Sequence, residues 1–123
     1  MARHTVGSTS IIGTHVENWD GENLGVIEEV MIDKNYGEVS YLVLAYPGRF
    51  GPRYHNKRFA IPFNAIAMKQ ITPREVEYIL NVDEAFLKRA PGFDKHNWPD
   101  FADKTFKSTL ADFYKDVSVD VFA

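Results

Sequence analysis

The stretch Val39-Ser40-Tyr41-Leu42-Val43-Leu44-Ala45-Tyr46 decides the fold, because it is the strongest strand candidate in the chain. Successive side chains of a strand point to opposite faces, so its odd-numbered residues share one face, and Leu42, Leu44 and Tyr46 share the other. Both faces are apolar, and each must therefore be covered. One face can line the interior of a small barrel. The other needs the C-terminal segment or a second protein chain to exclude water.

Short apolar segments separated by turn residues lie on both sides of this stretch and predict a mainly β fold. The turn Asp20-Gly21-Glu22-Asn23 predicts a hairpin between the first two strands. The pair Glu28-Glu29 interrupts the alternation of the second strand, and we expect a β-bulge there because a buried, unpaired carboxylate is costly. The predicted strands are six, over residues 14–19, 24–33, 39–46, 58–62, 66–71 and 76–80.

Helical patterns begin after Asn81. Asp83 suits the N-cap of a two-turn helix that Pro91-Gly92 ends. A second helix is predicted to begin between residues 100 and 103 and to reach Tyr114, because apolar side chains recur at helical spacing. Its apolar stripe suits the Leu42-Leu44-Tyr46 face, in the same molecule or in a neighbour. Beyond it, residues 117–122 predict a short strand that can add to a sheet edge.

Composition restricts the class of protein. The chain has 123 residues, of which 45% are hydrophobic, so one domain can bury a core without disulfides. A net charge of -3 argues against a protein that mainly coats nucleic acid. The lack of cysteine excludes thiol catalysis and cysteine-based metal sites. With no export signal or membrane-length apolar run, we expect a cytoplasmic protein without membrane insertion.

Short motifs follow one another in a specific order from Gly13 to Ala65. The most specific is the hairpin motif Asp-Gly-x-x-Leu-Gly at residues 20–25. The others are Gly13, Val16, Ile27, Val30, Ile32-Asp33, Gly37, Val39, Tyr41-Leu42-Val43, Phe59, Ile61-Pro62 and Ala65. Together they resemble the PRC-barrel family over about residues 10–81. The tail motifs Pro91-Gly92-Phe93-Asp94 and Asn97-Trp98-Pro99-Asp100 are similar to those of small stand-alone bacterial members.

The resemblance implies a small PRC-type β-barrel at residues 10–81, preceded by a flexible segment at 1–9 and followed by a helical extension at 82–123. It also implies a non-enzymatic interaction or assembly module, with no catalytic residue and no cofactor. We expect a protein partner, most simply a second copy of the chain. The candidate contact residues are Leu42, Leu44, Tyr46, Phe50, Arg53, Tyr54, Phe93, Trp98, Phe106, Leu110 and Tyr114.

The loop at residues 49–58 leaves a second function open, because it interleaves cations with aromatic residues. An RNA- or ribosome-associated module would use Arg49, Arg53, Tyr54, Lys57 and Arg58. One short patch on an acidic chain neutralises few phosphates, which disfavours this alternative. The histidines have no metal-ligand spacing, so we expect no metal site. An enzyme or small-ligand carrier is the least favoured class, because no nucleophile motif is present.

Overall fold

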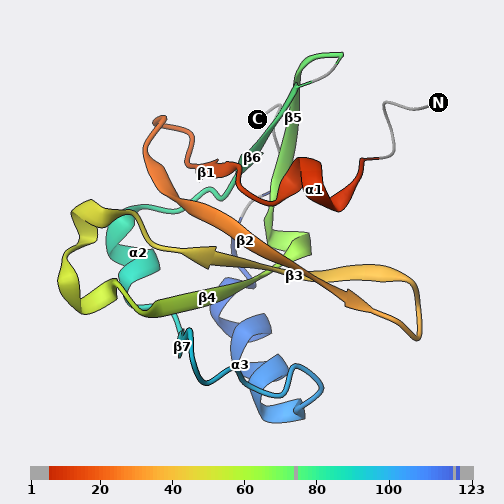
Figure 1. Ribbon diagram of the computed structural model, residues 1–123, viewed down its shortest axis with the longest axis vertical. Coiled ribbons are helices and arrows are strands. Elements are labelled where there is room, and N and C mark those ends of the chain that lie inside the picture. Colours follow the sequence, from red (N-terminus) through yellow and green to blue (C-terminus); the bar gives the residue numbers. More distant parts are fainter. Residues whose placement is uncertain (1–5, 74, 118, 120–123) are drawn as a thin grey trace.

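Seven strands form one sheet in the computed structural model, which describes residues 6–73, 75–117 and 119 (Figure 1). Across the sheet, the strand order is β5-β6-β1-β2-β3-β4-β7. The strands are β1 (His15–Glu17), β2 (Asn23–Asp33), β3 (Glu38–Ala45), β4 (Lys57–Pro62), β5 (Ala67–Thr72), β6 (Glu75–Ile79) and β7 (Phe93–Asp94). The predicted mainly β fold and its six strands are confirmed, with β7 as an additional short strand.

The sheet is open, which corrects the expectation of a closed barrel. All described strand pairs are antiparallel except β1 and β6, which run parallel with Val16 opposite Tyr78. Strands β5 and β7 are the two edges, and no pairing among the described residues joins them. The β5–β6 hairpin projects away from the β2–β3–β4 part of the sheet, so its outer edge does not return to β7 (Figure 1).

Strand β3 is buried on both faces, as its sequence predicts. No residue from Tyr41 to Ala45 is more than 9% exposed, and Leu42, Val43 and Leu44 are fully buried. Strands β2 and β4 flank β3 and cover its backbone edges. Because neither alternating set of side chains reaches solvent, both must be covered by parts of the chain outside these three strands.

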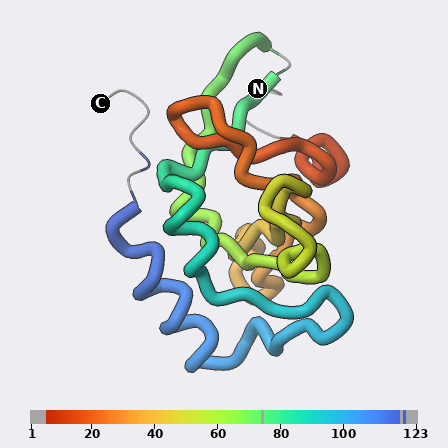
Figure 2. Tube along the Cα trace, turned by 90° about the vertical axis from the view of Figure 1, so that its left-hand side faces the viewer, coloured from red at the N-terminus to blue at the C-terminus, as the bar shows by residue number. Residues whose placement is uncertain are grey.

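The C-terminal extension supplies much of this cover. Both predicted helices are present, as α2 (Glu84–Lys88) and α3 (Lys104–Tyr114). Asp83 and Asp103 cap them, accepting hydrogen bonds from the backbone nitrogens of Phe86 and Phe106 at 2.7 and 2.8 Å. The helices lie along one side of the molecule (Figure 2). Buried residues of α3 join the same hydrophobic core as β3, so α3 covers the sheet of its own chain.

The bulge predicted at Glu28-Glu29 is confirmed. The register of β2 against β3 shifts between Ile27 and Glu29, and both glutamates reach the surface. Arg58 of β4 donates from Nε to Glu28 Oε1 at 2.5 Å. Ala45 of β3 lies opposite Arg58 in the register, and the Arg58–Glu28 bond therefore joins the two strands that flank β3. The bulge therefore places a carboxylate where it neutralises a buried arginine.

Some predicted segments lie partly outside the described residues. The predicted N-terminal segment 1–9 contains the start of a short helix, α1 (Ser8–Ile11), and its first five residues lie outside the description. Of the predicted strand at 117–122, Val117 and Val119 are described and neither belongs to a strand; the other residues of that segment lie outside the described part.

Gly25 approaches β3 too closely to carry a side chain. Its φ is +152°, and a Cβ atom there would lie 2.5 Å from the Ala45 carbonyl oxygen. We expect Gly25→Ala to lower the free energy of unfolding by about 2–4 kcal/mol, because β2 must move away from β3 or the backbone must change conformation. Urea denaturation measures this change.

The control is Gly48→Ala, because a Cβ atom at Gly48 would meet nothing within 4 Å. We expect it to change the free energy of unfolding by less than about 0.5 kcal/mol. Equal effects of the two substitutions would show that the close approach of β2 to β3 is not required.

Candidate functional site

The loop between β3 and β4 gathers four aromatic rings. Two turns of 3-10 helix, η2 (Gly48–Phe50) and η3 (Pro52–Tyr54), fold it back on itself. The ring of Tyr46 lies 3.8 Å from that of Phe59, 4.7 Å from that of Phe50 and 4.9 Å from that of Tyr54, centroid to centroid. Phe50 is only 5% exposed. The aromatic residues of this loop thus extend the hydrophobic core rather than stand out from it.

Cations surround the outer rings of this cluster. The guanidinium of Arg53 lies 5.5 Å from the Tyr54 ring centroid, and the ammonium groups of Lys57 and Lys88 lie 5.8 and 6.0 Å from it. Lys88 is also 4.8 Å from the Phe50 centroid. These distances allow weak cation–π attraction. The positive charges of three different chain segments therefore meet around one half-buried tyrosine.

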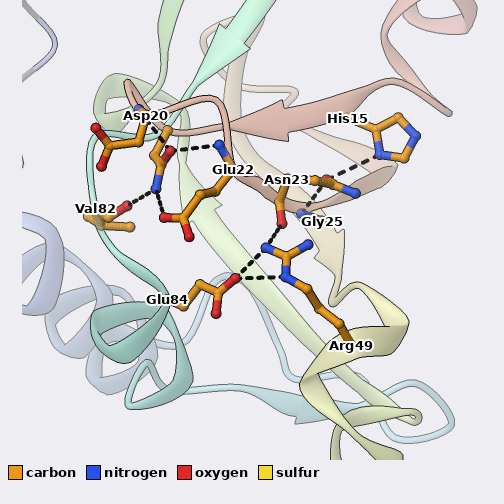
Figure 3. A network of polar contacts seen from close by, with 9 residues as sticks. His15, Asp20, Glu22, Asn23, Gly25, Arg49, Val82 and Glu84 are labelled. Atoms are coloured by element: carbon orange, nitrogen blue, oxygen red, sulfur yellow. Dashed lines mark hydrogen bonds and ion pairs between the residues drawn. The ribbon is translucent and has the colours of Figure 1, made fainter.

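Two other cations of the loop are already paired with carboxylates. Arg49 donates from Nε to Glu84 at 2.7 Å and also bonds the Asn23 carbonyl oxygen (Figure 3). Arg58 is paired with Glu28. The remaining ion pair within the described part of the chain joins Lys115 to Asp112. Of the four cations proposed for RNA binding, Arg53 and Lys57 have no carboxylate partner among the described residues.

A polar network holds the turn between β1 and β2 against the segment that precedes α2. The side-chain nitrogen of Asn18 donates to the Val82 carbonyl oxygen at 3.1 Å and to Glu22 Oε1 at 2.8 Å. Its oxygen accepts from the backbone nitrogens of Asp20 and Glu22, both at 3.0 Å. Sequence reasoning missed Asn18, whose one local signal is an asparagine just before an Asp-Gly turn. Together with the Arg49–Glu84 pair, this network joins three distant segments (Figure 3).

Two tyrosine hydroxyls are buried beneath the loop. Tyr46 Oη donates to the Leu87 carbonyl oxygen of α2. Tyr114 Oη is buried and has no hydrogen-bond partner among the described residues. Burial raises the pKa of Tyr46 well above 10.0, and the nearby Tyr114 and Tyr54 hydroxyls raise it further. Burial also raises the pKa of Tyr114. Both hydroxyls therefore stay protonated at neutral pH.

A second set of rings, the aromatic surface, consists of Phe93, Trp98, Phe101 and Phe106. Trp98 lies 5.2 Å from Phe93 and 6.1 Å from Phe101, and Phe101 lies 5.3 Å from Phe106, between ring centroids. Trp98 is 41% exposed, and Nε1 donates to the Lys95 carbonyl oxygen at 2.8 Å. Tyr41 joins these rings to β3. The aromatic surface is therefore partly open to solvent and anchored in the core.

The structure divides the candidate contact residues into two groups. Five are buried in the core of the chain itself: Leu42, Leu44, Phe50, Leu110 and Tyr114. The other six form two surfaces: Tyr46, Arg53 and Tyr54 lie at the loop, and Phe93, Trp98 and Phe106 lie on the aromatic surface. Strand β7 links the two, since Lys57 lies opposite Asp94.

The sheet edges offer little to an added strand. In β5, Met68 and Ile71 are 48% and 45% exposed, but Lys69 lies between them and the register shifts after Gln70. A lysine and a bulge are typical protections of an edge strand. At the other edge, β7 has only two residues. An interaction by surface contact therefore fits the structure better than strand addition.

Other kinds of site are not apparent in the described part of the chain. Within it, no three histidine or acidic side chains lie close enough to hold a metal ion. A groove of about 910 Å³ lies between the β2–β3 hairpin and α3, but charges of both signs line it, including Glu38 and Lys107. In the same described residues, none of the helices has the length and apolar character needed to cross a membrane.

One known family model matches most of the chain. The family model described as PRC-barrel domain matches residues 4–87. The matched residues include β1 to β6 and most of α2, and they extend past the boundary expected at residue 81. No curated protein matches the chain.

Removal of the hydroxyl should change the free energy of unfolding differently at Tyr46 and at Tyr114. We expect Tyr46→Phe to lower the free energy of unfolding by about 1–2 kcal/mol, because the Leu87 carbonyl loses its side-chain donor. Tyr114→Phe removes a buried hydroxyl without a partner, so its effect should be neutral or stabilising. Thermal or urea denaturation of both variants measures the difference, and a larger loss for Tyr114→Phe would contradict the assigned bonding.

Alkaline pH should destabilise the fold. Folding raises the pKa of both Tyr46 and Tyr114 above the ordinary value of 10.0. Below that pH both hydroxyls are protonated whether the chain is folded or unfolded, and their contribution is constant. Above it the unfolded chain releases protons that the folded chain retains, so stability falls as pH rises. The free energy of unfolding should fall less steeply in the Tyr46→Phe/Tyr114→Phe double variant; an equally steep fall would be evidence against the raised pKa values.

Proposed function

The chain belongs to the PRC-barrel domain family, and from this premise we propose that it is a non-enzymatic protein-interaction module that associates with a second copy of itself through the aromatic surface. The observation that supports this proposal is Trp98, a large apolar side chain that is 41% exposed within a continuous set of rings. Tryptophan contributes strongly to binding when an interface buries it.

The aromatic surface is also held ready for contact. The hydrogen bond from Trp98 to Lys95 and the ring contacts with Phe93 and Phe101 restrict the indole before any partner arrives. A restricted side chain loses little conformational entropy on binding. When a dimer buries the Trp98 ring, the entropy cost of ordering the side chain therefore offsets little of the hydrophobic free energy gained.

A second copy suits the charges around this surface. Asp94, Asp100 and Asp103 lie near Lys95 and Lys104 in the sequence that frames the rings. A two-fold interface brings together the same patch of both copies, with one patch rotated by half a turn relative to the other. Charges of both signs on one patch allow opposite charges to face each other there, which favours self-association over repulsion.

The RNA-associated alternative has less support. Arg49 and Arg58 are paired with carboxylates, so fewer cations remain for phosphates. Phe50 is buried and offers no ring face on which a base can stack. Among the described residues no cluster supports an enzyme or a small-ligand carrier, and we propose neither.

Two tryptophans of equal exposure provide a matched test. Trp98 is 41% exposed and Trp19 is 40% exposed, but Trp19 lies beyond β1, outside the aromatic surface. We expect Trp98→Ala to raise the dimer dissociation constant by at least about tenfold, because interface tryptophans contribute more than about 1.4 kcal/mol. Trp19→Ala should leave it unchanged. Sedimentation equilibrium over a range of protein concentrations measures both.

Thermal denaturation of both variants controls for loss of the fold. A wild-type chain that stays monomeric at all concentrations tested would refute self-association. Equal weakening by the two substitutions would instead assign the contact to another part of the chain.

A further inference from the structure

We propose that Arg53, Lys57 and Lys88, gathered around Tyr54, bind an acidic segment of a partner protein. These four residues are called the basic surface below. The inference goes beyond the proposed self-association, because it concerns a different partner and different side chains.

The basic surface is assembled by the fold rather than by neighbouring sequence. Arg53 comes from η3, Lys57 from the start of β4 and Lys88 from the end of α2. All three cationic groups lie within 6.0 Å of the Tyr54 ring centroid. Each of the three residues is exposed. The site therefore presents three positive charges to solvent within one small area.

The surrounding network keeps these elements in place. Arg49 ties the loop to Glu84 at the start of α2 (Figure 3), and Tyr46 ties it to Leu87 near the helix end. These bonds hold the backbone segments that carry Arg53 and Lys88 next to each other without a ligand. Groups that are positioned in advance lose less entropy on binding.

The charge balance favours an anionic partner. Glu84 of α2 and Glu28 of β2 already pair with Arg49 and Arg58. In contrast, Arg53, Lys57 and Lys88 have no carboxylate partner within the described residues. Asp94 lies across from Lys57 in the β4–β7 register but forms no ion pair with it. Like charges held together repel, and an incoming carboxylate relieves that repulsion.

The ring geometry favours acidic side chains over nucleic acid. Tyr46 and Phe50 pack edge-on against Tyr54, with centroids 4.9 and 5.9 Å away. The three cations lie around the remainder of the ring. Single-stranded RNA binding depends on open aromatic faces for base stacking. The basic surface offers charge without such a face, and carboxylates need only the charge and its hydrogen-bond donors.

The test measures binding of a fluorescein-labelled peptide of twelve glutamates by fluorescence anisotropy at low salt. The test variant is the triple substitution Arg53→Gln, Lys57→Gln, Lys88→Gln. The control is the triple substitution Lys34→Gln, Lys69→Gln, Lys107→Gln, which removes the same charge from three exposed lysines elsewhere. We expect the test variant to bind at least about tenfold more weakly and the control to change by less than about threefold.

Three results would overturn the inference. These are no peptide binding by the wild-type chain, equal weakening in both triple variants, or tighter binding of a twelve-nucleotide single-stranded RNA than of the peptide. If a triple variant has a lowered melting temperature, the single substitution Lys57→Gln replaces it in the test. We expect this substitution to weaken peptide binding by about threefold. Sedimentation equilibrium of the test variant separates the two proposals, because its dimer dissociation constant should equal that of the wild type, whereas Trp98→Ala should raise it.

Discussion

The burial of β3 on both faces is the constraint on which the rest of the structure depends. From Tyr41 to Ala45 the strand has no polar side to turn toward water, and every one of these residues is buried. A two-stranded or three-stranded sheet cannot satisfy this requirement by itself. Helices α2 and α3 therefore belong to the same hydrophobic core as the strands, although they lie at the C-terminal end of the chain. Removing their contribution would expose the centre of the sheet.

This constraint also decides which side chains remain for function. Leu42 and Leu44 of β3 and Leu110 of α3 belong to one hydrophobic core and are 0% exposed, so they are not available to a partner. The residues that are left lie where the packing ends, at the aromatic surface beside β7 and at the basic surface beside the β3–β4 loop. Both are consistent with an interaction module, because each presents contact groups and neither assembles a catalytic set.

Much of the fold could be predicted because its signals are local. Alternation identified the six main strands, and the cost of a buried carboxylate identified the bulge at Glu28. Asp83 identified the start of α2, and helical spacing placed the start of the second helix within a few residues of Asp103. Closure of the sheet was predicted wrongly, because it depends on where distant edges meet. Helix α1 and strand β7 were missed because four and two residues carry no periodic pattern.

The candidate sites were less predictable, because they depend on contacts between distant residues. Sequence alone identified Trp98 and the basic loop as contact candidates. It did not separate Arg49 and Arg58, which have partners 35 and 30 residues away, from Arg53 and Lys57, which have none among the described residues. Nor did it show that Lys88 joins the loop. Whether the second helix packs on its own chain or on a neighbour also required the structure.

Native-state hydrogen exchange at the amides of Leu42, Val43 and Leu44 tests the central claim most directly, measured over a wide range of protein concentration in the Trp98→Ala variant, because dimer formation through the aromatic surface would itself stabilise the wild-type fold at high concentration. If the chain covers both faces of β3 by itself, these amides are among the slowest to exchange, and their protection is the same in dilute and concentrated samples. Protection that falls on dilution would contradict the account, because a second molecule would then be covering the strand.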